Sequence, residues 1–130
     1  MLEDITVGTT GTLLRLVEEK SCTTRGDYQI FSTPNLVLLL EETAIEALAP
    51  FLPPTQSSVG TQVNVAHSAA TLLGQTVTCT ATVTEVDRRR IVFEITAHDG
   101  VEAITSGTHE RFVVDLQKFG GRLAEKAAQL

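Results

Sequence analysis

The chain has 130 residues, of which 42% are hydrophobic and 20% are charged, values that are ordinary for one globular domain and unlike those of a disordered chain. Ten Lys and Arg against sixteen Asp and Glu give a net charge of −6, which repels the phosphate backbone of nucleic acids. We therefore expect one domain over residues 1–130 that binds no nucleic acid.

The cysteines and the N-terminus indicate the compartment. Cys22 and Cys79 lie far apart without a CxxC or metal-ligand spacing, so we expect reduced thiols, no disulfide and no zinc site. The N-terminal residues MLEDITVGTT lack the basic and apolar regions of a signal peptide, and no apolar run approaches the roughly 20 residues that span a bilayer. These features predict a cytoplasmic protein outside the membrane, and no ligand cluster predicts a metal or redox cofactor.

One long helix is predicted in the first half of the chain. Residues 5–18 are consistent with an opening strand, and the polar residues 19–31 are expected to form a loop that covers something. Ser32 then supplies a capping hydroxyl, and Pro34 lies at a first-turn position where its missing N–H costs nothing. Pro50 disfavours helical geometry in the residue before it, so the helix should end by Ala49.

Alternating hydrophobic residues predict strands with one buried face in the second half. The segments are GTQVNVAH (60–67), QTVTCTATVTEV (75–86), RIVFEITAH (90–98) and VEAITSGTHERFVVD (101–115). Residues 87–90 predict a tight turn, residues 98–101 an Asp-Gly hairpin turn, and Gly107 a bulge or bend. A short surface helix is expected in residues 116–130. The fold class is therefore α+β, with a curved antiparallel sheet of about five strands around or against one long helix.

A carboxylate on the apolar side of that helix is the first candidate for chemistry. Glu41 shares a helix face with Val37, Leu38, Ala44 and Ile45. An ionised carboxylate there must lie at the edge of the stripe, pair with a cation, or serve chemistry in apolar surroundings that make it a stronger base. Taken from the helix alone, the pattern favours a boundary glutamate without any function, whose stem packs and whose head reaches water.

Three further residues are candidates, each with a structural alternative. His67 ends an alternating strand, where a histidine serves either catalysis or a hydrogen bond within the fold. Thr33 is a candidate site hydroxyl or the cap of the helix. Arg111 lies on the strand face opposite Phe112, where a salt bridge at the sheet surface is the alternative.

Three blocks together resemble one family. STPNLVLLLEE, GTQVNVAHSAAT and AHDGVEAITSGTHERFVVD, followed by KF, are similar in order and spacing to the hot-dog-fold acyl-CoA thioesterases of the fluoroacetyl-CoA thioesterase type. The resemblance covers most of the chain from Ser32 to Phe119. It implies a hot-dog fold and hydrolysis of a small acyl-CoA thioester, with coenzyme A as part of the substrate and no other cofactor.

The resemblance also assigns roles to residues. It implies that Thr33, Glu41 and His67 form the catalytic group and that Gly60 and Arg111 lie near the acyl pocket. We expect Glu41 to act as general base or nucleophile, and His67 to orient water or substrate and move a proton. In this family the sites lie between two sheets joined edge to edge, which implies a homodimer or a dimer of dimers. Thr33 and Glu41 are eight residues apart, about 12 Å along a helix, so they cooperate only through a fold-back or a second chain.

Two features bear on the substrate. Arg88, Arg89 and Arg90 are candidates for binding the phosphates of coenzyme A, and a solvated hairpin tip is their alternative. Fluoroacetyl-specific members carry a longer, aromatic-containing lid ahead of the helix, whereas residues 19–31 hold only Tyr28 and Phe31. We therefore expect small acyl groups in general rather than fluoroacetyl alone.

Two rival functions use the same fold. A hot-dog enoyl-CoA hydratase or dehydratase typically carries an Asp/His pair in a DxNPxH-like loop, and no such loop occurs in this sequence. A non-catalytic acyl-CoA-binding module would retain Glu41, His67 and Thr33 only incidentally.

Overall fold

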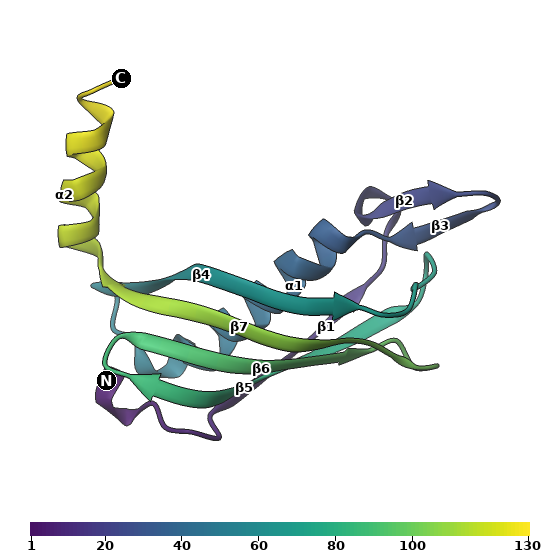
Figure 1. The fold of residues 1–130 in the computed structure, drawn as a ribbon, viewed down its shortest axis with the longest axis horizontal. Coiled ribbons are helices and arrows are strands. Elements are labelled where there is room, and N and C mark those ends of the chain that lie inside the picture. Colours follow the sequence, from purple (N-terminus) through teal and green to yellow (C-terminus); the bar gives the residue numbers. More distant parts are fainter.

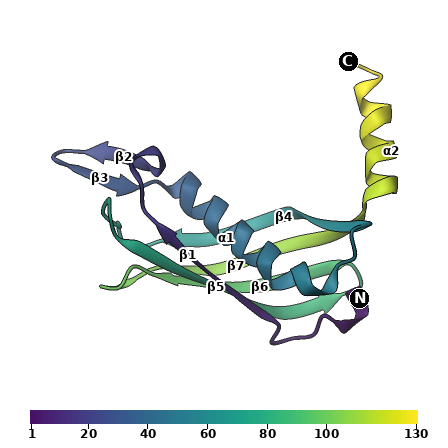
Figure 2. The same ribbon diagram turned by 180° about the vertical axis from the view of Figure 1, so that it is seen from behind.

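The computed structural model describes residues 1–130 and shows a curved antiparallel sheet with one long helix across one of its faces (Figures 1 and 2). Three single-turn 3-10 helices, at Leu2–Asp4, Glu19–Ser21 and Ala49–Phe51, join the main elements. Those elements, in chain order, are β1 (Thr10–Leu16), β2 (Cys22–Arg25), β3 (Tyr28–Phe31), α1 (Thr33–Leu48), β4 (Gln56–His67), β5 (Thr76–Asp87), β6 (Arg90–His98), β7 (Ala103–Asp115) and α2 (Leu116–Ala127).

The helix α1 confirms the predicted start and end, with one correction at its cap. Pro34 lies in the first turn, and the helix ends one residue before Ala49. Ser32 is the N-cap residue, but its side chain caps no backbone amide; its Oγ instead accepts a hydrogen bond of 2.6 Å from Asn35 Nδ2. The Thr33 hydroxyl, the other candidate cap, is also used elsewhere. The start of α1 is therefore defined by Pro34 and backbone geometry rather than by a side-chain cap.

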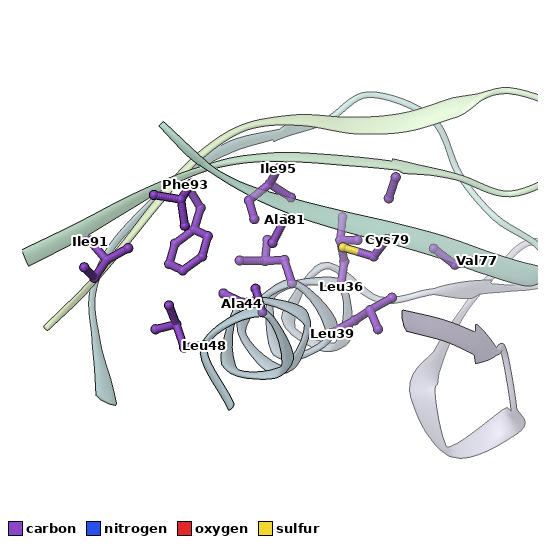
Figure 3. Close-up of a cluster of buried hydrophobic side chains, with 14 of the residues drawn as sticks. Leu36, Leu39, Ala44, Leu48, Val77, Cys79, Ala81, Ile91, Phe93 and Ile95 are labelled. Carbon is purple, nitrogen blue, oxygen red and sulfur yellow. The ribbon is translucent and has the colours of Figure 1, made fainter. Parts of the chain in front are cut away.

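The core lies between α1 and the inner face of the sheet. The main sheet has the order β1-β5-β6-β7-β4, with every neighbouring pair antiparallel. The predicted alternation is confirmed on β5 and β6, whose alternate side chains are buried against the helix. Figure 3 shows these side chains facing one another: Leu36, Leu39, Ala44 and Leu48 from α1, Val77, Cys79 and Ala81 from β5, and Ile91, Phe93 and Ile95 from β6.

The strand β4 does not follow the prediction of one buried face. It forms an edge of the sheet, and none of its twelve residues is buried; Val63 is 38% exposed. The pattern of its valines is that of a strand with a covered face, but the covering is only partial: Val65 packs against the core, whereas Val63 stays exposed. This long edge is therefore the most evident surface for a further strand.

Two other predictions are corrected. Residues 19–31 were expected to be a loop, but most of them form the hairpin β2–β3, which turns at Gly26 with φ +59°. The sequence predicts a bulge or bend at Gly107, yet this residue lies within β7 and pairs in register with Val65 and Ile95. The irregularities lie at Gly60/Gln62, Val83/Glu85 and Ala97/His98 instead. Glycine at position 107 allows β7 to approach β4 closely, because a Cβ there would overlap the backbone of β4.

The turns and the C-terminal helix confirm the remaining predictions. β5 and β6 are joined by a two-residue turn, in which Arg88 has φ +59°, and β6 and β7 by a loop that contains Gly100 at φ +90°. α2 extends away from the sheet at the end of β7 (Figure 1) and buries no residue. Cys22 and Cys79 are both free thiols. Neither helix is long and apolar enough to cross a membrane.

Candidate active site

Thr33 and His67 form the first part of the candidate site. Thr33 lies in the first turn of α1 and His67 is the last residue of β4, and their Oγ1 and Nδ1 atoms form a hydrogen bond of 2.8 Å. The same bond shows that Thr33 is not the helix cap. The other ring nitrogen of His67, Nε2, is buried and has no hydrogen-bond partner within the chain. A buried polar atom without a partner is unusual in a native fold and marks a place where another group belongs.

A cavity of about 380 Å³ lies beside this pair. Its lining comes from the hairpin β2–β3, the start of α1 and the segment after β4, and it includes Thr23, Arg25, Phe31, Ser68 and Ala69. Residues 19–31 were predicted to cover part of the molecule, and the hairpin that they form lines this cavity. Tyr28, however, is 64% exposed, and Phe31 belongs to the buried core. Arg25, which our sequence analysis did not single out, places a cation at this cavity.

Glu41 and Arg111 form the second part of the site. Arg111 Nη1 donates to Glu41 Oε2 over 3.1 Å, and the Arg111 side chain is 4% exposed whereas that of Glu41 is 34% exposed. Arg111 faces the helix from the inner side of β7, so the alternative of a salt bridge at the sheet surface is wrong. Glu41 lies at the edge of the apolar stripe, between the half-exposed Leu38 and Ile45. The carboxylate therefore lies against a guanidinium rather than among aliphatic side chains alone.

The Arg111 guanidinium is held from several sides. Its Nε and Nη2 donate to the Oγ and the carbonyl oxygen of Ser58 at 2.8 and 3.0 Å. Burial lowers the pKa of Arg111, and the Glu41 carboxylate acts in the opposite direction. Gly60 lies directly across the strand pair from Arg111, and a Cβ on Gly60 would overlap Glu41 Oε2. Glycine at this position is what leaves room for the carboxylate.

His109 is a residue of this part that our sequence analysis missed. It lies two residues before Arg111 on β7, is almost fully buried, and contacts Arg111 Nη1 through its Nε2 at 3.1 Å. Burial lowers the pKa of His109 and so does the Arg111 charge, while a hydrogen bond to the Gln62 carbonyl and the charges of Glu41 and Glu110 oppose the shift. The two-residue period of a strand, which places both side chains on one face, was the available signal.

The two parts do not meet within one chain. Thr33 and Glu41 lie eight residues apart on the continuous helix α1, which is about 12 Å along its axis. Gly60 and His67 are seven residues apart on β4, about 23 Å along a strand. The structure thus brings Thr33 to His67, and Glu41 to Gly60 and Arg111, but leaves the two groups separate.

The three turn arginines lie outside both parts. Arg88 pairs with Asp87, and Arg90 pairs with Glu85 and Glu110 on the outer face of the sheet. Arg89 has no carboxylate partner; its Nη1 donates to the Val113 carbonyl oxygen over 3.4 Å. No group of three or more His, Cys, Asp or Glu side chains is placed to hold a metal ion.

Comparison with known proteins identifies the family. Residues 7–117 match the model of the family described as FlK, fluoroacetyl-CoA-specific thioesterase. The chain belongs to this thioesterase family. It is 45% identical over 98 residues to the fluoroacetyl-CoA thioesterase of Streptantibioticus cattleyicolor, an overlap of 75% of this chain and 70% of that relative. As a member of the FlK family the protein is a thioester hydrolase, and the expectation from the sequence blocks is confirmed.

Solved structures confirm the hot-dog fold. A structure of the fluoroacetyl-CoA thioesterase FlK superimposes with a TM-score of 0.86 and 37% sequence identity, covering 94% of this chain and 97% of that one. A hot-dog-like protein from Thermanaerovibrio acidaminovorans gives a TM-score of 0.86 at 30% identity, covering 95% and 94% of the two chains. The FlK-family chain therefore has the hot-dog architecture over nearly its whole length.

Proposed function

We propose that this protein hydrolyses small acyl-CoA thioesters to the free acid and coenzyme A, with Glu41, His67 and Thr33 as the catalytic group. Membership of a thioesterase family supports the reaction type. The observation that carries the site is the Thr33–His67 hydrogen bond beside a cavity, with the second ring nitrogen of His67 buried and unpartnered. A carboxylate or a water held by a carboxylate is a suitable partner for that nitrogen.

The carboxylate would come from a second copy of the chain. The edge strand β4 has no neighbour on its outer side and exposes Val63. If two β4 strands pair antiparallel about a two-fold axis between Val63 and Asn64, Gly60 of one copy lies opposite His67 of the other, because both residues are equally far from the axis along the strand. The Glu41–Arg111 group beside Gly60 would then meet the Thr33–His67 pair across the interface. The active protein is accordingly a homodimer with two shared sites.

The chemistry follows from the groups in each part. The Glu41 carboxylate attacks the thioester carbonyl directly or takes a proton from an attacking water, so that a C–O bond forms and a negative charge develops on the carbonyl oxygen. Backbone amides near Gly60 can approach that oxygen because glycine has no side chain. The C–S bond then breaks and coenzyme A leaves as a thiolate, which His67 protonates. In the direct route a water then hydrolyses the acyl–Glu41 anhydride to the free acid and returns a proton to His67; in the other route Glu41 passes the proton of the attacking water to His67. A thiol has a pKa near 8.5 in model compounds, so thiolate departure needs little acid assistance.

The cavity beside Thr33 favours a small acyl group, and no aromatic lid covers it. The hairpin β2–β3 directs Tyr28 outward and adds Thr23, Arg25, Ile30 and Phe31 to the lining; of these only Phe31 is aromatic, and it belongs to the core. Fluoroacetyl-CoA, the substrate named for the relative from Streptantibioticus cattleyicolor, belongs to this size class. We propose acetyl-CoA and similar short acyl thioesters as substrates, with fluoroacetyl-CoA accepted but not exclusively preferred.

Two cations without carboxylate partners are candidates for the phosphates of coenzyme A. Of the three turn arginines, Arg89 alone has no carboxylate within salt-bridge distance, and Arg25 lines the cavity beside Thr33. If one of them binds a phosphate, its alanine variant should raise KM for acetyl-CoA but not for acetyl-pantetheine, which lacks the nucleotide. Arg88→Ala, at an exposed turn, is the control.

Turnover of an acyl-CoA panel tests the reaction. Thiol release, measured with a chromogenic thiol reagent, should be strong for two- to four-carbon acyl groups and should disappear in Glu41→Gln while the circular dichroism spectrum is unchanged. Full activity of Glu41→Gln would reject Glu41 as base or nucleophile. Hydration of an enoyl-CoA without thiol release would indicate a hydratase, and binding without turnover would indicate an acyl-CoA-binding module.

Mixed dimers test whether the site is shared. Co-expressed Glu41→Gln and His67→Asn chains should regain about a quarter of wild-type activity, because about half of the dimers are mixed and each mixed dimer has one intact site of two. Thr33→Val mixed with His67→Asn is the matched control, since both changes affect the same part of the site and every site stays defective. No recovery in the first mixture would contradict the shared site.

A further inference from the structure

His109 is the most deeply enclosed titratable side chain next to the candidate site. It extends from β7 to the inner side of the sheet and is 1% exposed. Its ring stacks on that of Phe93 from β6, with centroids 6.2 Å apart and planes inclined by 26°. The ring is therefore fixed in position by packing, and only its hydrogen bonds remain to be assigned.

The two neighbours of the ring determine its tautomer. His109 Nδ1 lies 2.8 Å from the carbonyl oxygen of Gln62, which can only accept, so Nδ1 carries the proton. His109 Nε2 lies 3.1 Å from Arg111 Nη1, which can only donate, so Nε2 presents its lone pair. An imidazolium would direct an N–H against the guanidinium N–H. The contacts thus select the neutral imidazole.

This arrangement divides the two hydrogens of Arg111 Nη1. One is directed to His109 Nε2 and the other to Glu41 Oε2, at 3.1 Å each. The Nε and Nη2 groups are already bonded to Ser58. When His109 Nε2 accepts one Nη1 hydrogen of Arg111, the other Nη1 hydrogen is directed toward the Glu41 carboxylate.

His109 also contacts the irregular part of β4. The Gln62 carbonyl that accepts from Nδ1 follows the register shift between Gly60 and Gln62. A Cβ on Gly60 would lie 3.3 Å from His109 Cε1, so the ring forms one wall of the space that Gly60 leaves open. The same imidazole therefore links the strand that carries Gly60 to the guanidinium that holds Glu41.

We propose that His109 is a positioning residue, whose neutral imidazole in the Nδ1–H tautomer directs the Arg111 guanidinium and thereby holds the Glu41 carboxylate in place for thioester cleavage. This inference rests on the proposed function of Glu41. His109 itself does not touch the substrate. Its effect on the reaction passes through Arg111.

Nitrogen NMR of the free protein tests the tautomer without any substrate. In protein labelled with ¹⁵N at histidine, the His109 signals, identified by their absence from His109→Gln, should show a protonated Nδ1 and an unprotonated Nε2 at pH 7. A proton on Nε2, or on both nitrogens, would overturn the proposal. This measurement needs no turnover. If the protein cleaves none of the thioesters, the proposed function is rejected, but the NMR signals still decide the tautomer.

Two variants separate the two hydrogen bonds. His109→Gln can place an amide oxygen near the position of Nε2 and keep the acceptor for Arg111, whereas His109→Asn keeps only a donor for Gln62. We expect kcat for acetyl-CoA to stay within about threefold of wild type in His109→Gln and to fall about 100-fold in His109→Asn, the order expected when a reacting group is misplaced by about 1 Å. KM should change little in either.

A stability control excludes a merely structural role. Ile95→Val, in the buried core on β6, should lower the melting temperature without changing kcat. If the kcat values of the two His109 variants followed their melting temperatures, or if both variants were equally impaired, the proposed link through Arg111 would be wrong. Equal, undiminished activity of both would overturn it as well.

Discussion

Thr33 Oγ1 and His67 Nδ1 are 2.8 Å apart, although the two residues are separated by 34 positions in the chain. The bond joins the first turn of α1 to the last residue of β4. It occupies one ring nitrogen of His67, so Nε2 is the nitrogen left for the proposed reaction. Nε2 is buried without a partner, so in the mechanism that we propose Thr33 orients the ring and Nε2 is the reacting atom.

Removal of the Thr33 hydroxyl should therefore impair catalysis more than folding. We expect Thr33→Val, which keeps the shape of the side chain, to lower kcat for acetyl-CoA by about 100-fold, within the usual range for an assisted proton transfer. Thr33→Ser keeps the hydroxyl and should retain most of the activity. Steady-state kinetics and melting curves on the three proteins check this, and equal kcat in Thr33→Val and wild type would show that the bond has no catalytic role.

A side chain at Gly60 should displace the Glu41 carboxylate. The Cβ of Gly60→Ala would overlap Glu41 Oε2 and lie 3.3 Å from Arg111 Nη1. Because the carboxylate is the free end of a flexible side chain, it can move aside, so we expect a loss of at least about tenfold in kcat with only a small change in melting temperature. Gly120→Ala, in α2 with open space around it, should leave kcat unchanged and raise stability by about 0.5–1 kcal/mol.

Gly107→Ala should instead damage the fold. Its φ of +153° is unfavourable for other residues, and its Cβ would overlap the backbone of β4 at Asn64 and Val65. Strain and overpacking together should cost about 2–6 kcal/mol of unfolding free energy. Gly74 also has a positive φ, but a Cβ added there would have no atom within 4 Å. Gly74→Ala should therefore lower the unfolding free energy only through backbone strain, by about 1–3 kcal/mol. Urea unfolding measures both; similar losses would mean that strand contact at Gly107 does not matter.

Asp99 should make stability dependent on acid pH. Burial opposes its ionisation, but the amides of Val101 and Glu102 and the Thr71 hydroxyl donate to its carboxylate and lower its pKa overall. A lowered pKa means that the carboxylate stabilises the fold above the unfolded value of about 3.9 and that this contribution is lost as the pH falls through the lower, folded value.

We expect Asp99→Asn to be about 1–2 kcal/mol less stable than wild type at pH 7. The difference should shrink as the pH falls below about 4. Urea unfolding over a pH series measures it, with Asp87→Asn as an exposed control expected to change stability by less than about 0.5 kcal/mol. A difference that stays constant down to pH 2 would contradict the assigned role of ionised Asp99.

Much of the architecture was predictable from local pattern. Pro34 and Pro50 delimit α1, and the alternation on β5 and β6 correctly identifies the buried side chains of both strands. These signals depend on neighbours a few positions away in the chain, where backbone geometry alone sets which side chains share a face. The hairpin β2–β3 was missed because its strands are only four residues long and largely polar, although the Gly26–Asp27 turn was an available signal.

The sequence by itself determined most of the element types, most of the core and, through the matching blocks, the family. Only the tertiary structure decided that Arg111 faces inward to Glu41, that His109 contacts Arg111, and that Thr33 rather than Glu41 contacts His67 within one chain. These contacts depend on which strands are adjacent and in which register, as with β4 beside β7. Periodicity along one strand carries no information about its neighbour, so the partners of a buried polar side chain appear only when the sheet is assembled.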